Sequence, residues 1–305
     1  MTAYEGILPV LKPAGFTSHD VVAKCRGILK MKRIGHTGTL DPAVTGVLPL
    51  CLGRATRMVE YLQELPKEYE ATLILGVATD TEDMSGTVVE QLDQVSVTEE
   101  AVRLVLQRFV GTISQVPPMY SALKHDGKRL YELAREGKTV ERKAREVTIY
   151  ELELLSFHPE GPHPTIKFRA LCSKGTYIRT LCVDIGRALG VPAAMAQLKR
   201  TVSAGITEQS CLTLEEIARH AAQGDLASYL LPVDQGVRYL PAHTLAEDKV
   251  KAALQGQRLP AAAVNPQANR GELIRLYDPQ QRFLGIFKTD EETLAVKAVK
   301  VFFPD

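Results

Sequence analysis

Hydrophobic and polar residues change their spacing several times along the chain, and each change marks a predicted element. A short apolar run over residues 6–11 predicts a strand. Thr17 or Ser18 can cap a following helix, because each offers a side-chain oxygen to the free N–H groups of the first turn. One face of this helix is apolar and is expected to be buried: Val21, Val22, Cys25, Ile28 and Leu29.

The next part of the chain predicts two strands and a helix. Strand spacing begins near Tyr69, and a second strand near residues 86–90 follows an acidic turn over residues 80–85. The turn lacks the spacing of a calcium loop, so we interpret it as a solvated hairpin. Ser96 and Glu99 are spaced as a capping box and predict that an amphipathic helix begins there.

The run "TIKFRALCSKGTYIRTLCVDIGRALG" changes from strand spacing to helical spacing at Ser173–Gly175. Its helix has one apolar stripe: Ile178, Leu181, Cys182, Ile185 and Leu189. Tyr177 and Arg179 lie at the helix entrance, beside this stripe rather than within it. A later helix begins at a capping box made by Thr213 and Glu216.

The C-terminal part has a different texture. Short β-like runs, "ELIRLYD", "RFLGIFK" and "AVKAVKVFF", are joined by turns rich in Gly, Pro and Asn. We therefore expect two domains, residues 1–240 and a small β-rich domain over residues 241–305.

Residues 120–146 carry little apolar sequence. They hold eight Lys or Arg, five acidic residues, His125 and two tyrosines. A solvated surface arm and an arm that follows a nucleic-acid backbone both fit this composition. The residues alone do not separate the two.

The composition is that of a soluble globular protein. The chain has 305 residues, 45% of them hydrophobic and 24% charged. A net charge of +1 neither favours nor excludes a nucleic-acid partner. The five cysteines form no CxxC pair and no zinc-binding spacing, which is typical of structural thiols. No apolar run reaches transmembrane length and no signal-peptide core is present, so we expect a cytoplasmic protein without a membrane partner.

The stretch "RIGHTGTLDPAVTGVLP" isolates one carboxylate, Asp41, in a turn rich in glycine and proline. Pro42 disfavours a helical Asp41, and Gly35, Gly38 and Gly46 permit a positive φ or the close approach of another backbone. The surroundings offer too few ligands for a metal site, and the chain has no GxSxG elbow and no phosphate-loop fingerprint. What remains is an acid nucleophile or base near a basic, aromatic surface.

The loop "GHTGTLDPAVTGVLP" closely resembles the catalytic loop of the TruB-type bacterial tRNA pseudouridine-55 synthases. Other blocks resemble the same family in the same order: "LKPAGFTSHDVV", "KEYEATLILGVATDTEDMSG", "QVPPMYSALKHDGKRLYELAREG" and "CSKGTYIRTLCVDIG". The C-terminal segment is similar to the family's PUA-like RNA-binding domain, by a less specific pattern.

The resemblance implies the isomerisation of uridine 55 in the T-loop of tRNA to pseudouridine. The uracil is cut at N1, turned and rejoined through C5, so no cofactor and no metal is expected. The catalytic aspartate matches Asp41, and attack on the base or on the sugar carbon both remain open. The arginine that pairs with it matches Arg179, which would hold Asp41 by a bidentate bond. The tyrosine that stacks on the uracil matches Tyr69, a contact worth roughly 1–3 kcal/mol, and its hydroxyl is a candidate to move the C5 proton.

The resemblance also implies residues that bind the flipped nucleotide. His36 matches the loop histidine that fills the vacated place in the RNA. Tyr177 lies beside the arginine, and Leu198 matches the apolar residue that closes the pocket. Residues 120–146 match the mobile insertion that grips the T-arm.

The implied fold is α+β: a pseudouridine synthase fold, with a mixed and mostly antiparallel sheet, flanking helices and a basic insertion, followed by the PUA-like domain. The implied partner is tRNA, bound by a monomer without a guide RNA. Two alternatives are a guide-RNA-dependent pseudouridine synthase of the archaeal and dyskerin type, and a tRNA-folding chaperone without catalysis. The short C-terminal segment and the stretch "LILGVATDTEDMSGTVVE" argue against the first, and an intact Asp41 argues against the second.

Overall fold

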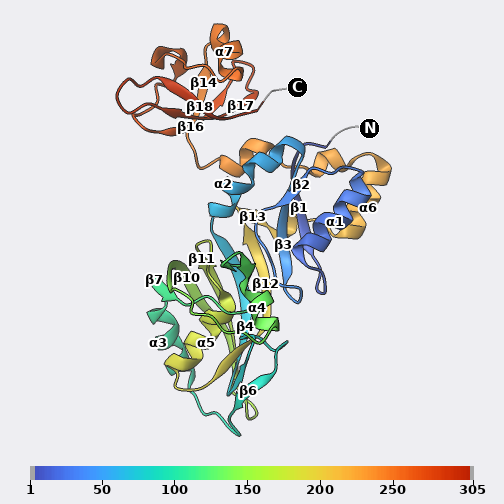
Figure 1. The fold of residues 1–305 in the computed structure, drawn as a ribbon, viewed down its shortest axis with the longest axis vertical. Coiled ribbons are helices and arrows are strands. Elements are labelled where there is room, and N and C mark those ends of the chain that lie inside the picture. The colour runs from blue at the N-terminus through green and yellow to red at the C-terminus, as the bar shows by residue number, and fades with distance from the viewer. Residues whose placement is uncertain (1–3, 303–305) are drawn as a thin grey trace.

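The computed structural model describes residues 4–302, which form two main sheets joined by a short helical connection (Figure 1). The larger sheet has nine strands, seven of them in the order β1-β3-β12-β4-β11-β10-β7, with β2 paired to β3 and β13 to β12. Its strands are β1 (Gly6–Lys12), β2 (Ile34–His36), β3 (Thr45–Leu52), β4 (Lys67–Leu75), β7 (Gly111–Gln115), β10 (Arg145–His158), β11 (Thr165–Cys172), β12 (Ala193–Ser203) and β13 (Ile206–Thr207). Only the short β12–β3 pairing is parallel, so the sheet is mixed and mostly antiparallel, as predicted.

Two pairs of helices cover different parts of this sheet (Figure 1). The pair α1 and α6 shares one core cluster with β1 and β3, and the pair α3 and α5 shares another with β4, β10, β11 and β12. The α-helices are α1 (Ser18–Leu29), α2 (Val59–Glu64), α3 (Glu99–Arg108), α4 (Leu130–Arg135), α5 (Ile178–Ala188), α6 (Leu214–Gln223) and α7 (Val250–Leu254). Strands from both halves of the chain thus bury a separate core on each side of the β3–β12 junction.

The predicted helix starts were correct at two of three places. Thr17 caps α1 and Thr213 caps α6, each within a capping box. The predicted box of Ser96 and Glu99 is wrong, because Thr98 caps α3 instead. Val97 and Val102 flank this cap and join the same apolar cluster, and such a hydrophobic staple fixes the entry of the chain at Thr98.

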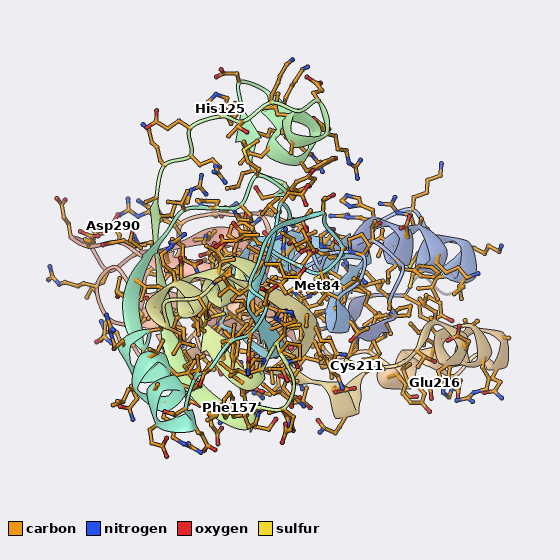
Figure 2. All side chains as sticks on the ribbon, turned by 90° about the horizontal axis from the view of Figure 1, so that it is seen from below. Met84, His125, Phe157, Cys211, Glu216 and Asp290 are labelled. Atoms are coloured by element: carbon orange, nitrogen blue, oxygen red, sulfur yellow. The ribbon has the colours of Figure 1, made fainter. Side chains whose placement is uncertain are left out.

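Two small hairpins extend from the large sheet. One is formed by β5 (Val77–Thr79) and β6 (Val88–Gln91). The other lies in residues 120–146, where β8 (Lys124–His125) and β9 (Lys128–Arg129) precede α4. His125 at the tip of this arm stands clear of the rest of the molecule (Figure 2).

The second sheet forms the C-terminal part, in the order β15-β14-β16-β17-β18. Its strands are β14 (Ala242–Leu245), β15 (Val264–Asn265), β16 (Leu273–Tyr277), β17 (Phe283–Thr289) and β18 (Val296–Val301). The three predicted β-like runs are β16, β17 and β18, although Phe303 in the third run lies outside the described residues.

Specific contacts dock this second sheet against the first part of the chain. The Arg57 guanidinium lies 5.4 Å from the centre of the Phe302 ring and donates a 2.6 Å hydrogen bond to the Val301 carbonyl. The Tyr277 hydroxyl donates to the Asp234 carboxylate at 2.7 Å. Arg57 lies on the 3-10 segment Gly53–Met58, which follows β3 directly, so these contacts place the second sheet next to an edge of the large sheet's own chain segment.

Four of the five cysteines are buried, as expected of structural thiols, and Cys211 is half-buried. Within residues 4–302, no helix has both the length and the apolar character to span a membrane.

Candidate active site

Asp41 lies on the loop that connects β2 to β3, and a buried lysine holds this loop in shape. The Lys12 ammonium is fully buried and donates to the carbonyls of Pro13, Pro42 and Val44 at 2.9, 3.1 and 2.6 Å. Burial lowers the pKa of Lys12 to about 8, so the lysine is still charged at neutral pH. These three bonds hold the backbone that follows the aspartate, at Pro42 and Val44, against the chain at Pro13.

Gly46 fixes the other end of this loop against β12. Its φ is +113°, and a Cβ atom there would collide with the backbone of Arg200 on the neighbouring parallel strand. Only glycine permits so close an approach at a positive φ. The predicted role of Gly46 in a close backbone contact is therefore confirmed.

Arg179 forms an ion pair with Asp41, with 3.0 Å between the guanidinium and the carboxylate. The guanidinium is only 6% exposed, whereas the aspartate side chain is 42% exposed. Its remaining donors bind the carbonyls of Thr81 at 3.0 Å and Tyr120 at 2.8 Å. The predicted bidentate Arg–Asp bond is not formed: the Nη2 atom near the carboxylate also donates to the Tyr120 carbonyl, and Nη1 donates to the Thr81 carbonyl.

The acidic turn between β5 and β6 is part of this site. Asp83 lies 3.8 Å from the Arg179 guanidinium and pairs with Met195 of β12 in an isolated β-bridge. Glu82 accepts a 2.7 Å hydrogen bond from the Thr180 hydroxyl, and burial raises the pKa of this carboxyl group. The predicted hairpin is formed, but its turn is not fully solvated, because the backbone pairing with β12 brings Glu82 and Asp83 onto the start of α5.

Asp41 and Arg179 line a cleft of about 670 Å³. Tyr69, Tyr177 and Leu198 all line the cleft. Burial raises the pKa of both phenols. The structure therefore brings together Asp41, Arg179, Tyr69, Tyr177 and Leu198, which come from four separate segments of the chain.

His36 lies at the edge of this group rather than in the cleft wall. The wall begins with Thr37 and Gly38, the next residues along the chain. The His36 ring lies edge-on to His19, with 5.3 Å between the ring centres, and burial lowers its pKa to about 4. At neutral pH this imidazole is uncharged.

Three polar residues of the cleft wall were not expected from the sequence: Lys67, Arg200 and Ser121. Lys67 and Arg200 are buried cations on β4 and β12, and the signal in the sequence is a basic residue at an inward position of a strand. Burial and the nearby Arg200 charge lower the pKa of Lys67 to about 8. Ser121 lies at the start of the basic arm, so the root of the arm forms part of the cleft.

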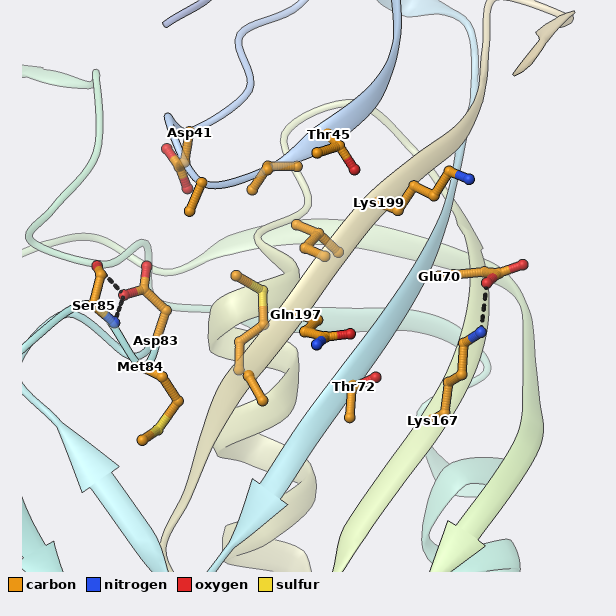
Figure 3. A pocket seen from close by; sticks show the side chains of 15 residues that line it. Asp41, Thr45, Glu70, Thr72, Asp83, Met84, Ser85, Lys167, Gln197 and Lys199 are labelled. Atoms are coloured by element: carbon orange, nitrogen blue, oxygen red, sulfur yellow. Dashed lines mark hydrogen bonds and ion pairs between the residues drawn. The ribbon is translucent and has the colours of Figure 1, made fainter. Parts of the chain in front are cut away.

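A second hollow of about 550 Å³ adjoins Asp41 on the other side of its loop (Figure 3). Gln197 and Lys199 reach it from β12, and Glu70 and Thr72 from β4. The wall of this hollow holds both acidic and basic side chains, whereas the charged side chains of the cleft wall are mostly cations. Among residues 4–302, no three His, Cys, Asp or Glu side chains are grouped so that they could hold a metal ion.

Known proteins share this arrangement of segments. The family model "TruB family pseudouridylate synthase (N terminal domain)" matches residues 26–178, and two models of TruB C-terminal domains match residues 179–238 and 241–299. The tRNA pseudouridine synthase B of Burkholderia pseudomallei is 45% identical over 301 residues, covering 98% of both chains. The chain belongs to the TruB family of pseudouridylate synthases. It is an isomerase that forms pseudouridine in tRNA.

Other members and solved structures agree with this family. The tRNA pseudouridine synthase B of Geobacillus thermodenitrificans is 47% identical over 263 residues, covering 84% of this chain and 87% of that protein. In the crystal structure of a Cbf5–Nop10–Gar1 complex, one chain superposes with a TM-score of 0.77 at 30% identity, covering 99% of this chain and 86% of that one. The pseudouridine synthase fold and the α+β class are thereby confirmed.

Proposed function

We propose that this TruB-family enzyme isomerises uridine 55 in the T-loop of tRNA, with Asp41 as the essential carboxylate and without a guide RNA. The observation that carries the proposal is the half-exposed Asp41 carboxylate, paired with a buried Arg179 beside a cleft lined by Tyr69 and Leu198. The bond between N1 and the ribose breaks, the uracil turns, and C5 forms the new bond to the same carbon. C5 loses one proton and N1 gains one, so uridine and pseudouridine have the same composition.

The cleft supplies a place for a base that has left the RNA stack. Tyr69 stacks on the flipped uracil and Leu198 closes the pocket. Tyr177 lies close to Arg179 in sequence, at the start of α5. His36 fills the vacated place in the RNA. Its neutral imidazole suits this role, because a neutral ring can replace a base without adding a charge to the stack.

The basic arm over residues 120–146 grips the T-arm through phosphate contacts. Its root already belongs to the cleft, since the Tyr120 carbonyl binds Arg179 and Ser121 lines the wall. The division into a catalytic part (1–240) and a PUA-like part (241–305) belongs to the same proposal, supported by the two separate sheets. The same proposal includes action as a monomer in the cytoplasm.

The test is release of tritium from C5-labelled uridine in an unmodified tRNA transcript, without guide RNA. Wild type should release tritium, and Asp41→Asn should reduce release to background while binding the transcript within a few-fold of wild type. Asp93→Asn, the same change at an exposed position, serves as the matched control and should keep the wild-type rate. A transcript with cytidine at position 55 should release nothing.

Each other outcome would contradict one part of the proposal and favour a different function, acid or target. Release by neither enzyme would favour the guide-dependent or the chaperone function. Release by Asp41→Asn as fast as by wild type would show that Asp41 is not the essential acid. Release from the transcript with cytidine 55 would place the target at another uridine.

A further inference from the structure

Arg200 is the largest fully buried side chain of the protein's described part, and it lies in the wall of the catalytic cleft. It is 1% exposed. Its guanidinium donates to the Val47 carbonyl at 2.7 Å and to the Gly38 carbonyl at 3.1 Å. No carboxylate within residues 4–302 forms an ion pair with it. Burying a charge without an opposite charge is costly, so its position calls for a function.

Arg200 is the cross-strand neighbour of Tyr69. The two residues are direct partners in the antiparallel pairing of β12 with β4, and both side chains line the cleft. Directly opposed residues bring their Cβ atoms to about 5 Å. The Arg200 guanidinium lies close enough to the Tyr69 hydroxyl to act on its pKa. The arginine thus lies between Tyr69 and the Asp41 loop, with bonds to Gly38 in the loop and to Val47 in β3.

This proximity changes the chemistry of the Tyr69 hydroxyl. Burial raises the pKa of the phenol, whereas the positive charge of Arg200 acts in the opposite direction. A donor with a positive charge stabilises a phenolate more than a neutral phenol. A guanidinium held by two carbonyls keeps this donor in place before the substrate arrives, and such preorganisation avoids reorganisation during the reaction.

We propose that Arg200 is a positioning residue of the isomerisation, which aims the Tyr69 oxygen and stabilises its phenolate for removal of the C5 proton. This rests on the proposed function. The phenolate oxygen takes the proton from C5 once C5 is bonded to the ribose carbon, and the C5–H electron pair restores the uracil ring. N1 takes a proton from water, and the new phenol returns its proton to water. No proton is gained or lost overall.

The first experiment measures the link between Arg200 and Tyr69 without any reaction. The full-length protein is labelled with 3,5-difluorotyrosine, whose more acidic phenol titrates at lower pH, and its ¹⁹F resonances are followed against pH. The resonance of residue 69 is the one missing from Tyr69→Phe. Arg200→Gln should lower the phenolate fraction of this residue about ten-fold at a given pH below its midpoint. Arg200→Lys should give a smaller decrease, because a lysine keeps the charge but lacks the planar fork.

Lys199→Gln is the matched control, because it removes the adjacent charge from the other hollow, where Lys199 pairs with Glu208. It should leave the residue 69 titration unchanged. If Arg200→Gln does not fold, Arg200→Lys decides. A residue 69 titration equal to that of wild type in the folded Arg200 variants would overturn the proposal.

The second experiment measures single-turnover isomerisation of tRNA that carries uridine or 5-deuterouridine at position 55. Arg200→Lys should lower the single-turnover rate with uridine and enlarge the deuterium isotope effect. The difference in rate between this variant and wild type should shrink as pH rises toward the midpoint of the Tyr69 titration. A slower rate with an unchanged isotope effect and pH profile would reduce Arg200 to a structural residue and overturn the proposal. If wild type does not turn over at all, the proposed function fails, while the ¹⁹F titration still reports whether Arg200 controls Tyr69.

Discussion

The Asp41 loop and the arm over residues 120–146 are both connections, yet they are built in opposite ways. The loop is tied down from three sides: by Lys12, by the Ser18 hydroxyl, which accepts from the Leu40 N–H at 2.9 Å, and by Arg200. The arm consists of a two-strand hairpin and a six-residue helix with mostly exposed cations. Under the proposed function, the loop holds the Asp41 carboxylate in place, and the arm supplies positive charge to a partner with less fixed geometry.

The arm is not wholly without a core. Leu130 and Leu133 of α4 are buried, and Arg142 donates to the Pro117 carbonyl at 3.0 Å at the base of the arm. The Arg129 and Arg135 guanidiniums lie 5.9 and 5.4 Å from the centre of the Tyr131 ring. These contacts shape the arm locally, whereas the root at Tyr120 and Ser121 ties it to the cleft.

The largest expected effect comes from removing the anchor of the loop. Lys12→Met leaves three buried carbonyls without their donor, which should cost about 3 kcal/mol of unfolding free energy. A displaced Asp41 should slow isomerisation at least about 100-fold. Binding of tRNA should stay within a few-fold, since the arm is intact. Urea unfolding, single-turnover tritium release and filter binding measure the three quantities.

Lys124→Met is the matched control on the arm, because its side chain is exposed. It should unfold like wild type. If Lys12→Met isomerises at the wild-type rate, the rigidity of the loop does not depend on Lys12, and the contrast between the two connections is smaller than we infer.

A middle-sized effect is expected from the arm's charges. Binding of tRNA should weaken steeply with salt, because phosphate contacts release counterions. The double variant Lys124→Gln/Lys128→Gln should weaken binding about ten-fold at physiological salt and make the slope of log K against log salt shallower by about 1.5. Its unfolding should match wild type, because both side chains are exposed.

Arg103→Gln/Arg108→Gln removes the same charge from exposed positions of α3 and is the control. It should keep the wild-type slope. A flat salt dependence of the wild-type enzyme, or equal slopes for the two double variants, would mean that the arm is not a backbone clamp.

The smallest expected effect concerns acid stability. Because burial lowers the pKa of His36 from 6.5 to about 4, the unfolded chain binds more protons than the folded one between these two values. Stability from this group is therefore complete above pH 6.5 and is lost as pH falls toward 4. At pH 5, after a discount for partial exposure, the loss is about 1 kcal/mol.

His36→Gln should therefore lose less unfolding free energy than wild type when urea unfolding is measured at pH 5 instead of pH 7. His125→Gln, on the exposed arm, should follow wild type. Identical pH dependence of His36→Gln and wild type would show that the His36 ring is not held away from water in solution.

Much of the fold could be predicted because its elements carry local signals. Thr17 and Thr213 cap helices whose apolar faces repeat at helical spacing, and β4, β11 and α5 follow from changes of period. The start of α3 was misplaced, because Ser96 and Thr98 offer the same cap chemistry and only the packing of Val97 and Val102 in the core chooses between them.

The sequence by itself determined that Asp41 lies in a loop, since Pro42 acts directly on the backbone of the residue before it. The tertiary structure decided the environment of Asp41. Arg179 meets Asp41, Thr81 and Tyr120, which are 138, 98 and 59 residues away along the chain, and Arg200 meets Tyr69 only through the register of β12 with β4. Long-range pairing brings these groups together, and no local spacing reports it. For that reason the acid could be predicted from the sequence, whereas the buried cations that hold the acid and the tyrosine had to be found in the fold.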